Sequence, residues 1–220
     1  MATRQVLSEL ASAYERLADC RVAIESVGGV DAAKRVTAGE VFDVVVLASD
    51  AIAKLASAGH VQAGSQVDLV RSGVAVAVQA GAVLPDISSE DAVRRTVLAA
   101  RSVSYSTGPS GVALLALFDR WGITEQIKSR LVQAPAGVPV GSLVAKGDVE
   151  LGFQQYSELM SLPGITVIGP LPPAIQIVTT FTAAVGTGAP QPDAARALLA
   201  YMSSAQAAAT IRRHGMEPAS

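Results

Sequence analysis

The sequence predicts an α/β fold in which strands and helices alternate along the chain. Half of its 220 residues are hydrophobic and only 4% are aromatic. Ala and Val make up most of this apolar content, which suits Val-rich buried strands packed against Ala-rich helices. Short apolar runs and amphipathic segments also follow one another throughout, as is typical of βαβ units.

In the first third of the chain, turns and helix caps separate the predicted elements. A first helix can begin at Thr3, which is a good N-cap residue, and it carries an apolar stripe of Val6, Leu7, Leu10, Tyr14 and Leu17. The elements expected after it are a strand at 21–27, a helix from Asp31, a strand at 42–49, a helix at 50–59 that stops at a glycine, a strand at 71–81 and a helix at 88–100 capped by Ser88 or Ser89.

The rest of the chain continues the alternation without an internal repeat or a low-complexity linker. The expected elements are a strand at 102–105, a helix ending at Gly122, helices at 124–131 and 142–148, strands at 149–155, 165–172 and 175–185, and helices at 191–204 and 205–215. We therefore predict an α/β rather than an α+β architecture.

Charge and composition exclude several classes of function. A net charge of −2 argues against a nucleic-acid-binding protein, which needs a basic face to neutralise phosphates. No apolar run is long enough to cross a bilayer, so no membrane insertion is expected. The N-terminus lacks the features of a secretory signal, which predicts a cytoplasmic location as given, or a periplasmic one if an upstream signal was removed.

Metal and cofactor sites are not expected either. His60 and His214 lack metal-ligand spacing, and the single cysteine, Cys20, allows no intrachain disulfide.

The segment "SYSTGPSGV" (104–112) is the first candidate site, because it joins a strand to a helix through hydroxyl side chains and glycines. Ser106, Thr107 and Ser110 can donate hydrogen bonds to an anion at a helix N-terminus, while the glycines let the backbone approach it. The alternative is that Ser110 or Thr107 only caps the helix. The turns "MATR", "SVGGV" and "PAGVPVG" have a similar character, and four such turns around one cleft would form an oxyanion or carboxylate receptor.

Several segments in order resemble the molybdate-binding-protein-like branch of the type II periplasmic binding proteins. They are "GGVDAAKRVTAGEVFDVVVLASDAIAKLASAGHV", "SYSTGPSGVALLALFDRWGI", "VPVGSLVAKGDVELGFQQYSEL" and "AARALLAYMSSAQAAATIRRHGMEP". The resemblance implies two α/β lobes with mixed, mainly parallel sheets, made of residues 1–70 plus 181–220 and of residues 71–180. Hinge strands near Arg71 and Thr180 would join the lobes, and a small anion would be bound in the cleft between them.

The resemblance also implies a substrate-binding protein of an ABC transporter, with the transporter permease as a candidate partner. The ligand-binding residues expected on this basis are Thr3, Arg4, Gly29, Arg71, Ser106, Thr107, Ser110, Val138 and Gln155. Three departures from the family pattern are visible. Met1 stands inside what would be the first anion loop, "GGVD" offers only backbone N–H groups with Ser26 nearby, and Gln155 stands where a tyrosine commonly lines the cleft.

The arginines favour an organic acid with several carboxylates over molybdate, because a guanidinium can bind a carboxylate through two hydrogen bonds. The alternatives are a salt bridge of Arg71, for example with Asp68, and a solvated position for Arg4. Besides transport binding, two other functions stay open: an isomerase or tautomerase of a polycarboxylate, resembling aconitate isomerase, and a ligand-sensing regulatory domain. Gln155, Ser157, Glu158 and the hydroxyls of residues 104–110 are candidates for the required proton transfer.

Overall fold

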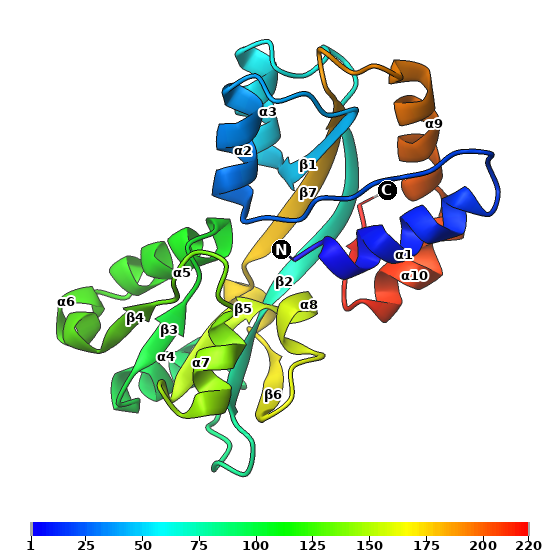
Figure 1. The fold of residues 1–220 in the computed structure, drawn as a ribbon. Coiled ribbons are helices and arrows are strands. Elements are labelled where there is room, and N and C mark those ends of the chain that lie inside the picture. Colours follow the sequence, from blue (N-terminus) through cyan, green and yellow to red (C-terminus); the bar gives the residue numbers. More distant parts are fainter. Residues whose placement is uncertain (1, 220) are drawn as a thin grey trace. The chain divides into compact units, whose positions relative to one another are not determined.

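The chain forms two compact units in the computed structural model, which describes residues 2–219 (Figure 1). Unit 1 comprises Met1–Ser72 and Thr179–Ser220, and unit 2 comprises Gly73–Val178. Two strands, β2 (Val67–Gln79) and β7 (Val178–Val185), contain the boundaries between the units. The predicted α/β fold with mixed sheets is confirmed, and each unit has its own sheet region, helices and apolar core. The expectation that the sheets are mainly parallel is wrong, because β2 pairs antiparallel with three neighbouring strands and β7 pairs antiparallel with a fourth.

Unit 1 is built on a small sheet with helices on both of its faces. Its strands are β1 (Val44–Ala48), β7, the first half of β2, and β8 (Glu217–Pro218). β1 pairs antiparallel with β7 and β8 pairs antiparallel with β2, while β7 and β2 are neighbours in the sheet.

The helices of unit 1 divide between two cores, and the alternation of side chains along β7 separates these cores. Ala183 and Val185 pack in one core with α1 (Arg4–Glu15), α9 (Pro192–Met202) and α10 (Ala208–Arg213). Ala184, between them, packs in the other core with α2 (Gly29–Thr37) and α3 (Ser49–Ser57). Successive side chains of a strand point to opposite faces of the sheet, so the buried strand β7 contributes side chains to both cores.

Unit 2 has a five-stranded mixed sheet in the order β4 (Leu131–Gln133), β3 (Val103–Tyr105), β5 (Leu151–Gln155), the second half of β2, and β6 (Ile165–Pro170). β3 runs parallel to both β4 and β5. β2 runs antiparallel to β5 and to β6.

Helices cover both faces of the unit 2 sheet. The main core lies between the sheet, α4 (Glu90–Ala99) and α5 (Pro109–Arg120), and it is centred on the fully buried Phe118. α7 (Val140–Lys146) covers the opposite face of β5 at Gly152. A Cβ atom on Gly152 would lie only 2.6 Å from a Val144 methyl group, so glycine is needed for this close helix packing. The short helices α6 (Thr124–Ile127) and α8 (Tyr156–Leu159) and the 3-10 turns Lys128–Arg130, Pro173–Ile175 and Ala205–Ala207 complete the chain.

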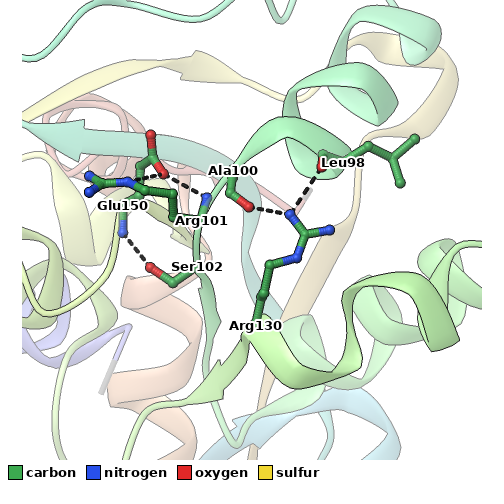
Figure 2. A network of polar contacts seen from close by, with 6 residues as sticks. All are labelled: Leu98, Ala100, Arg101, Ser102, Arg130 and Glu150. Atoms are coloured by element: carbon green, nitrogen blue, oxygen red, sulfur yellow. Dashed lines mark hydrogen bonds and ion pairs between the residues drawn. The ribbon is translucent and has the colours of Figure 1, made fainter.

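Helix α4 has polar groups at both of its ends. At the start, the Ser89 side chain accepts a hydrogen bond from the Ala92 N–H (3.2 Å), so Ser89 rather than Ser88 is the cap. At the end, the Arg130 guanidinium donates to the carbonyls of Leu98 (3.0 Å) and Ala100 (Figure 2). These carbonyls have no partner within the helix, and the cation also interacts favourably with the negative end of the helix dipole.

A second group of contacts links the turn after α4 to the start of β5 (Figure 2). The Glu150 carboxylate accepts from the Arg101 backbone N–H (2.7 Å) and side chain (3.2 Å), and the Glu150 N–H donates to the Ser102 hydroxyl (2.9 Å). Because these contacts join the residues just before β3 to the residue just before β5, they help to set the register of β3 beside β5.

The observed strands differ from the sequence-based expectation in two respects. Residues 21–27 do not form a strand. Ile24 and Val27 are 39% and 37% exposed, and the Val22 N–H donates to the Glu15 carboxylate instead of to a neighbouring strand. The short strands β4 and β8 were not expected, because three and two residues carry no readable alternation pattern. Among residues 2–219, no helix combines the length and apolar character needed to cross a membrane.

Candidate functional site

The strand ends of unit 2 bring five of the expected ligand-binding residues to one edge of its sheet. Because β3 is parallel to β4 and β5, the carboxyl ends of these three strands lie at the same edge. From there the chain continues into α5, α7 and α8, respectively. We call this the strand-end edge, and its predicted residues are Ser106, Thr107, Ser110, Val138 and Gln155. Ligands of α/β proteins bind at this kind of edge.

Two serine hydroxyls meet at the start of α5. The Oγ atoms of Ser106 and Ser110 are 3.2 Å apart, and Ser110 is only 6% exposed. The N-cap residue of α5 is Gly108, and no side chain caps the helix. The alternative that Ser110 or Thr107 only serves as a cap is therefore contradicted. The hydroxyl pair lies where the positive end of a twelve-residue helix favours negative charge.

Gly111 determines how closely Ser106 approaches the helix. A Cβ atom at Gly111 would lie 1.9 Å from the Ser106 carbonyl oxygen, which is far inside any real contact distance. Glycine therefore allows the Ser106 backbone to pack on the first turn of α5. The sequence predicts that this glycine lets the backbone approach a ligand, whereas the structure shows that it allows a close contact within the protein.

The two glutamines at the end of β5 point to opposite faces of the sheet. The Gln155 side chain lies on the same face of β5 as that of Phe153, toward α5, and is 4% exposed. The Gln154 side chain lies on the opposite face, the one on which Gly152 contacts α7, and is 3% exposed. It accepts a hydrogen bond from the Gly141 N–H (3.3 Å). Sequence reasoning missed Gln154, although a glutamine doublet in a buried strand is itself a signal that polar partners are nearby.

The remaining residues at this edge lie in the segments that come after β4 and β5. The Val138 N–H donates to the Pro135 carbonyl (3.0 Å), and its side chain is 39% exposed just before α7. Ser157 and Glu158 lie in α8. Burial raises the pKa of the Glu158 carboxyl, because a charged carboxylate loses solvation, and a hydrogen bond from Gln154 opposes this shift.

Unit 1 has a comparable arrangement at the end of β1. α3 starts at Ser49, directly after β1, and α2 starts at Gly29. A Cβ atom on Gly29 would lie 3.7 Å from a Leu47 methyl group, which places the start of α2 beside the end of β1. Two helix N-termini therefore lie close together. Sequence reasoning missed Ser49, although its place between an apolar run and an amphipathic helix could have indicated it.

The other expected residues of unit 1 lie on α1 and β2. Thr3 is the 8% exposed N-cap residue of α1, with no hydrogen bond from its side chain to the helix, and Arg4 is exposed. Arg71 is exposed and donates to the Pro218 carbonyl (3.3 Å). Asp68 accepts from the Thr182 hydroxyl (2.5 Å). The ligand-binding roles of Thr3, Arg4 and Arg71 stay predictions.

The expectation about Met1 lies outside the described residues. Within residues 2–219, no three His, Cys, Asp or Glu side chains are grouped so that they could hold a metal ion.

Comparisons with known proteins find similarity over nearly the whole chain. A family model described as bacterial extracellular solute-binding protein matches residues 1–217. An aconitate isomerase from a Pseudomonas species is 39% identical over 218 residues, with 96% of this chain and 83% of that protein covered.

Solved structures show the same fold. The periplasmic molybdate-binding protein of Azotobacter vinelandii matches with a TM-score of 0.80 at 19% identity, over 97% of this chain and 94% of that chain. A substrate-binding protein of an ABC transporter from Agrobacterium tumefaciens matches with a TM-score of 0.76 at 14% identity, over 96% and 76% of the two chains. The resemblance to type II periplasmic binding proteins is thus confirmed, and the chain belongs to the family of bacterial extracellular solute-binding proteins.

Proposed function

We propose that this chain binds a small anion, either an organic carboxylate or an oxyanion such as molybdate, as the substrate-binding protein of an ABC-type transporter. The observation that carries the proposal is the pair of Ser106 and Ser110 hydroxyls, 3.2 Å apart at the N-terminus of α5 and not used as a helix cap. Two adjacent hydroxyls at the positive end of a helix dipole are suited to donate to one anionic group.

Unit 1 has candidate donors of its own in this proposal. The N-termini of α2 and α3 supply backbone N–H groups, including that of Gly29. Arg4 and Arg71 are the cationic candidates, and we favour an organic acid with several carboxylates because a guanidinium matches the planar carboxylate fork. In this proposal one Arg71 donor binds Pro218, and its remaining N–H groups are those offered to the ligand.

Family membership supports a periplasmic location and a transporter permease as the partner. Members of this family are described as extracellular solute-binding proteins, and one structural neighbour is the substrate-binding protein of an ABC transporter. A binding protein of this kind delivers its solute to a membrane component and needs no membrane span of its own.

A ligand panel tests the binding proposal. Thermal shifts followed by isothermal titration calorimetry would compare molybdate and sulfate with succinate, citrate and aconitate. We expect at least one carboxylate to bind. We expect Ser106→Ala and Ser110→Ala to weaken its binding by about 10- to 150-fold each, since a hydrogen bond to a charged group contributes about 1.5–3 kcal/mol.

The matched control is Ser57→Ala, which removes an exposed hydroxyl that bonds to the Ala53 carbonyl within α3. This variant should bind like the wild type. Full affinity in the Ser106→Ala, Ser110→Ala double variant would overturn the proposed site. Binding of molybdate and sulfate without any carboxylate would overturn the preference for an organic acid.

A second candidate function is isomerisation of a polycarboxylate. The observation that favours it is the 39% identity, over nearly the whole chain, to a protein named aconitate isomerase. Proton NMR in deuterium oxide separates the two functions, because an isomerase introduces deuterium at carbon whereas a binding protein leaves the C–H bonds intact. Aconitate that binds without exchange would exclude this second function for that substrate.

A further inference from the structure

Unit 1 contains a pocket that the proposed anion site does not use. Its volume is about 170 Å³, and the residues that line it include Val36, Glu40, Phe42, Val45, His60 and Thr187. We propose that this pocket binds a compact organic ammonium ion, with Glu40 as its anionic partner. The proposal concerns unit 1 alone and goes beyond anion binding.

The pocket lies where α2 and α3 end, at the beginning of β1. Both helices pack in one core beside this strand (Figure 1), and Phe42, two residues before β1, lines the pocket. The lining residues Gly39 and Gly59 each stand two residues after a nine-residue helix, α2 and α3, respectively. The C-terminal end of a helix is the negative end of its dipole and favours a nearby cation. The starts of the same two helices, which are the candidate anion donors, lie away from this pocket.

The charged groups at the pocket have a negative balance. Among residues 2–219, the lining has one carboxylate, that of Glu40, and no lysine or arginine. Arg35, outside the lining, donates to Glu40 (Nε to Oε2, 2.6 Å) and to Glu25 (2.6 Å), so two carboxylates face one guanidinium. The hydrogen bond from Arg35 lowers the pKa of the Glu40 carboxyl, which therefore stays ionised. A carboxylate has about four acceptor positions, and those that Arg35 leaves free can bind an ammonium group.

Apolar groups provide a surface for the carbon atoms of the ligand. Val36 and Val45 are each 6% exposed and form part of the lining, together with the half-buried Phe42 ring. The Arg35 guanidinium lies 5.2 Å from the centroid of this ring, so Arg35 holds both Phe42 and Glu40 in place. A ligand with an alkyl part and a positive charge matches this combination of apolar side chains, aromatic ring and carboxylate.

Backbone contacts fix the walls of the pocket before any ligand binds. The His60 N–H donates to the Leu55 carbonyl (2.9 Å), and the His60 carbonyl accepts from the Thr187 N–H (3.1 Å). A Cβ atom on Gly186 would lie 2.2 Å from the Phe42 carbonyl oxygen, so glycine allows the end of β7 to approach Phe42 closely. A preformed pocket loses less conformational entropy on binding, which favours even a small ligand.

The volume limits the size of the ligand. A cavity of about 150 Å³ is large enough for benzene, so a pocket of about 170 Å³ holds roughly six to eight non-hydrogen atoms. Pentylammonium and choline are ammonium ions of this size, and pentan-1-ol and 3,3-dimethylbutan-1-ol are their uncharged counterparts of the same shape. These four compounds are the probes.

The first experiment titrates the full chain with each probe by calorimetry and by ligand-observed NMR. We expect at least one ammonium ion to bind with a dissociation constant of about 1 mM or lower. Its uncharged counterpart should bind at least about tenfold more weakly, because it gains no attraction from Glu40. Equal affinity for the alcohol would overturn the assignment to a cation. No binding of either ammonium ion up to about 10 mM would overturn the pocket as a ligand site.

Two variants place the bound ion in this pocket. Glu40→Gln removes the carboxylate and should weaken binding by about tenfold or more. Gly188→Leu keeps the charge and occupies part of the pocket; a Cβ there would lie 3.5 Å from a Val41 methyl group, an ordinary contact. It should weaken binding to a similar extent. The matched control is Glu125→Gln, which removes an exposed carboxylate that pairs with Lys128 (3.4 Å) in unit 2, and it should bind like the wild type.

Thermal melting shows whether each variant is folded. Wild-type affinity for the ammonium ion in folded Gly188→Leu would overturn the site, even if Glu40→Gln failed to fold. An equal loss of affinity in Glu125→Gln would also overturn it, because the attraction would then come from the net charge of the chain and not from this pocket.

Discussion

Replacing Gly111 with alanine tests whether the hydroxyl pair depends on a close backbone approach. The added Cβ would lie 1.9 Å from the Ser106 carbonyl oxygen, whereas real Cβ atoms essentially never come closer than 3.0 Å to another atom. The two segments must therefore separate by about 1 Å. The obstacle is backbone, which cannot rotate away as a flexible side chain can, so the loop that carries Ser106 has to move.

Two opposing effects set the size of the destabilisation. Forcing an extra methyl group into a packed site costs about 1–3 kcal/mol, and a clash with backbone belongs at the upper end. Alanine is better than glycine inside a helix by about 0.5–1 kcal/mol, which offsets part of this cost. The net loss is about 2 kcal/mol, which corresponds to a fall in the melting temperature of about 6 °C for a chain of this size.

Gly108→Ala is the matched control in the same loop. Gly108 has a φ of −81°, and a Cβ there would lie 3.7 Å from the Ser106 hydroxyl, an ordinary contact. We expect it to cost less than about 1 kcal/mol, the typical difference between glycine and alanine at an N-cap. Thermal and urea denaturation measure both variants, and calorimetry with a bound anion should show weaker binding for Gly111→Ala. Wild-type stability of Gly111→Ala, or an equal loss in Gly108→Ala, would refute the reasoning.

Three further predictions concern stability. Phe118→Ala should cost about 3–5 kcal/mol in urea denaturation, because this fully buried ring lies at the centre of the unit 2 core; a loss below 1 kcal/mol would contradict that placement. Arg130→Met should cost about 1–3 kcal/mol by leaving the Ala100 carbonyl and its neighbours without a donor, and Arg130→Lys should recover part of this. Hydrogen bonds from His214 and Arg213 lower the pKa of Glu9 below its ordinary 4.5. The stability contributed by Glu9 is therefore present above about pH 4.5 and is lost as the pH falls through its lower folded value. The melting temperature of Glu9→Gln should approach that of the wild type in acid, and a constant difference between pH 3 and 6 would exclude this linkage.

Much of the fold could be predicted from sequence because the local signals agree with the tertiary context. The run "FDVVVLAS" contains β1, and the segment 88–100 contains α4 with Ser89 as its cap. In both places hydrophobic periodicity, capping residues and turns favour the same structure. The strand expected at 21–27 failed for the opposite reason. Its apolar residues satisfy the local pattern, but a strand requires a partner for its backbone, and Val22 donates to Glu15 instead.

Parts of the candidate site were also accessible from sequence. Hydroxyls next to glycines at a helix start suggest an anion site, which points to Ser106 and Ser110, and in the structure their Oγ atoms lie 3.2 Å apart. Gln154 and the hydrogen bond from Gly141 were not accessible. They depend on how α7 packs on β5, which no local pattern encodes.

The sequence by itself determined the alternation of elements, the family and the residues from which an anion site could be built. These properties depend on short-range periodicity, on turn residues and on motif order along the chain. Only the tertiary structure decided which hydroxyls are left uncommitted by helix capping, which glycine is required by a backbone contact, and which backbone N–H the buried Gln154 amide accepts from. Each of these depends on atoms from segments that come together only when the sheets and helices pack.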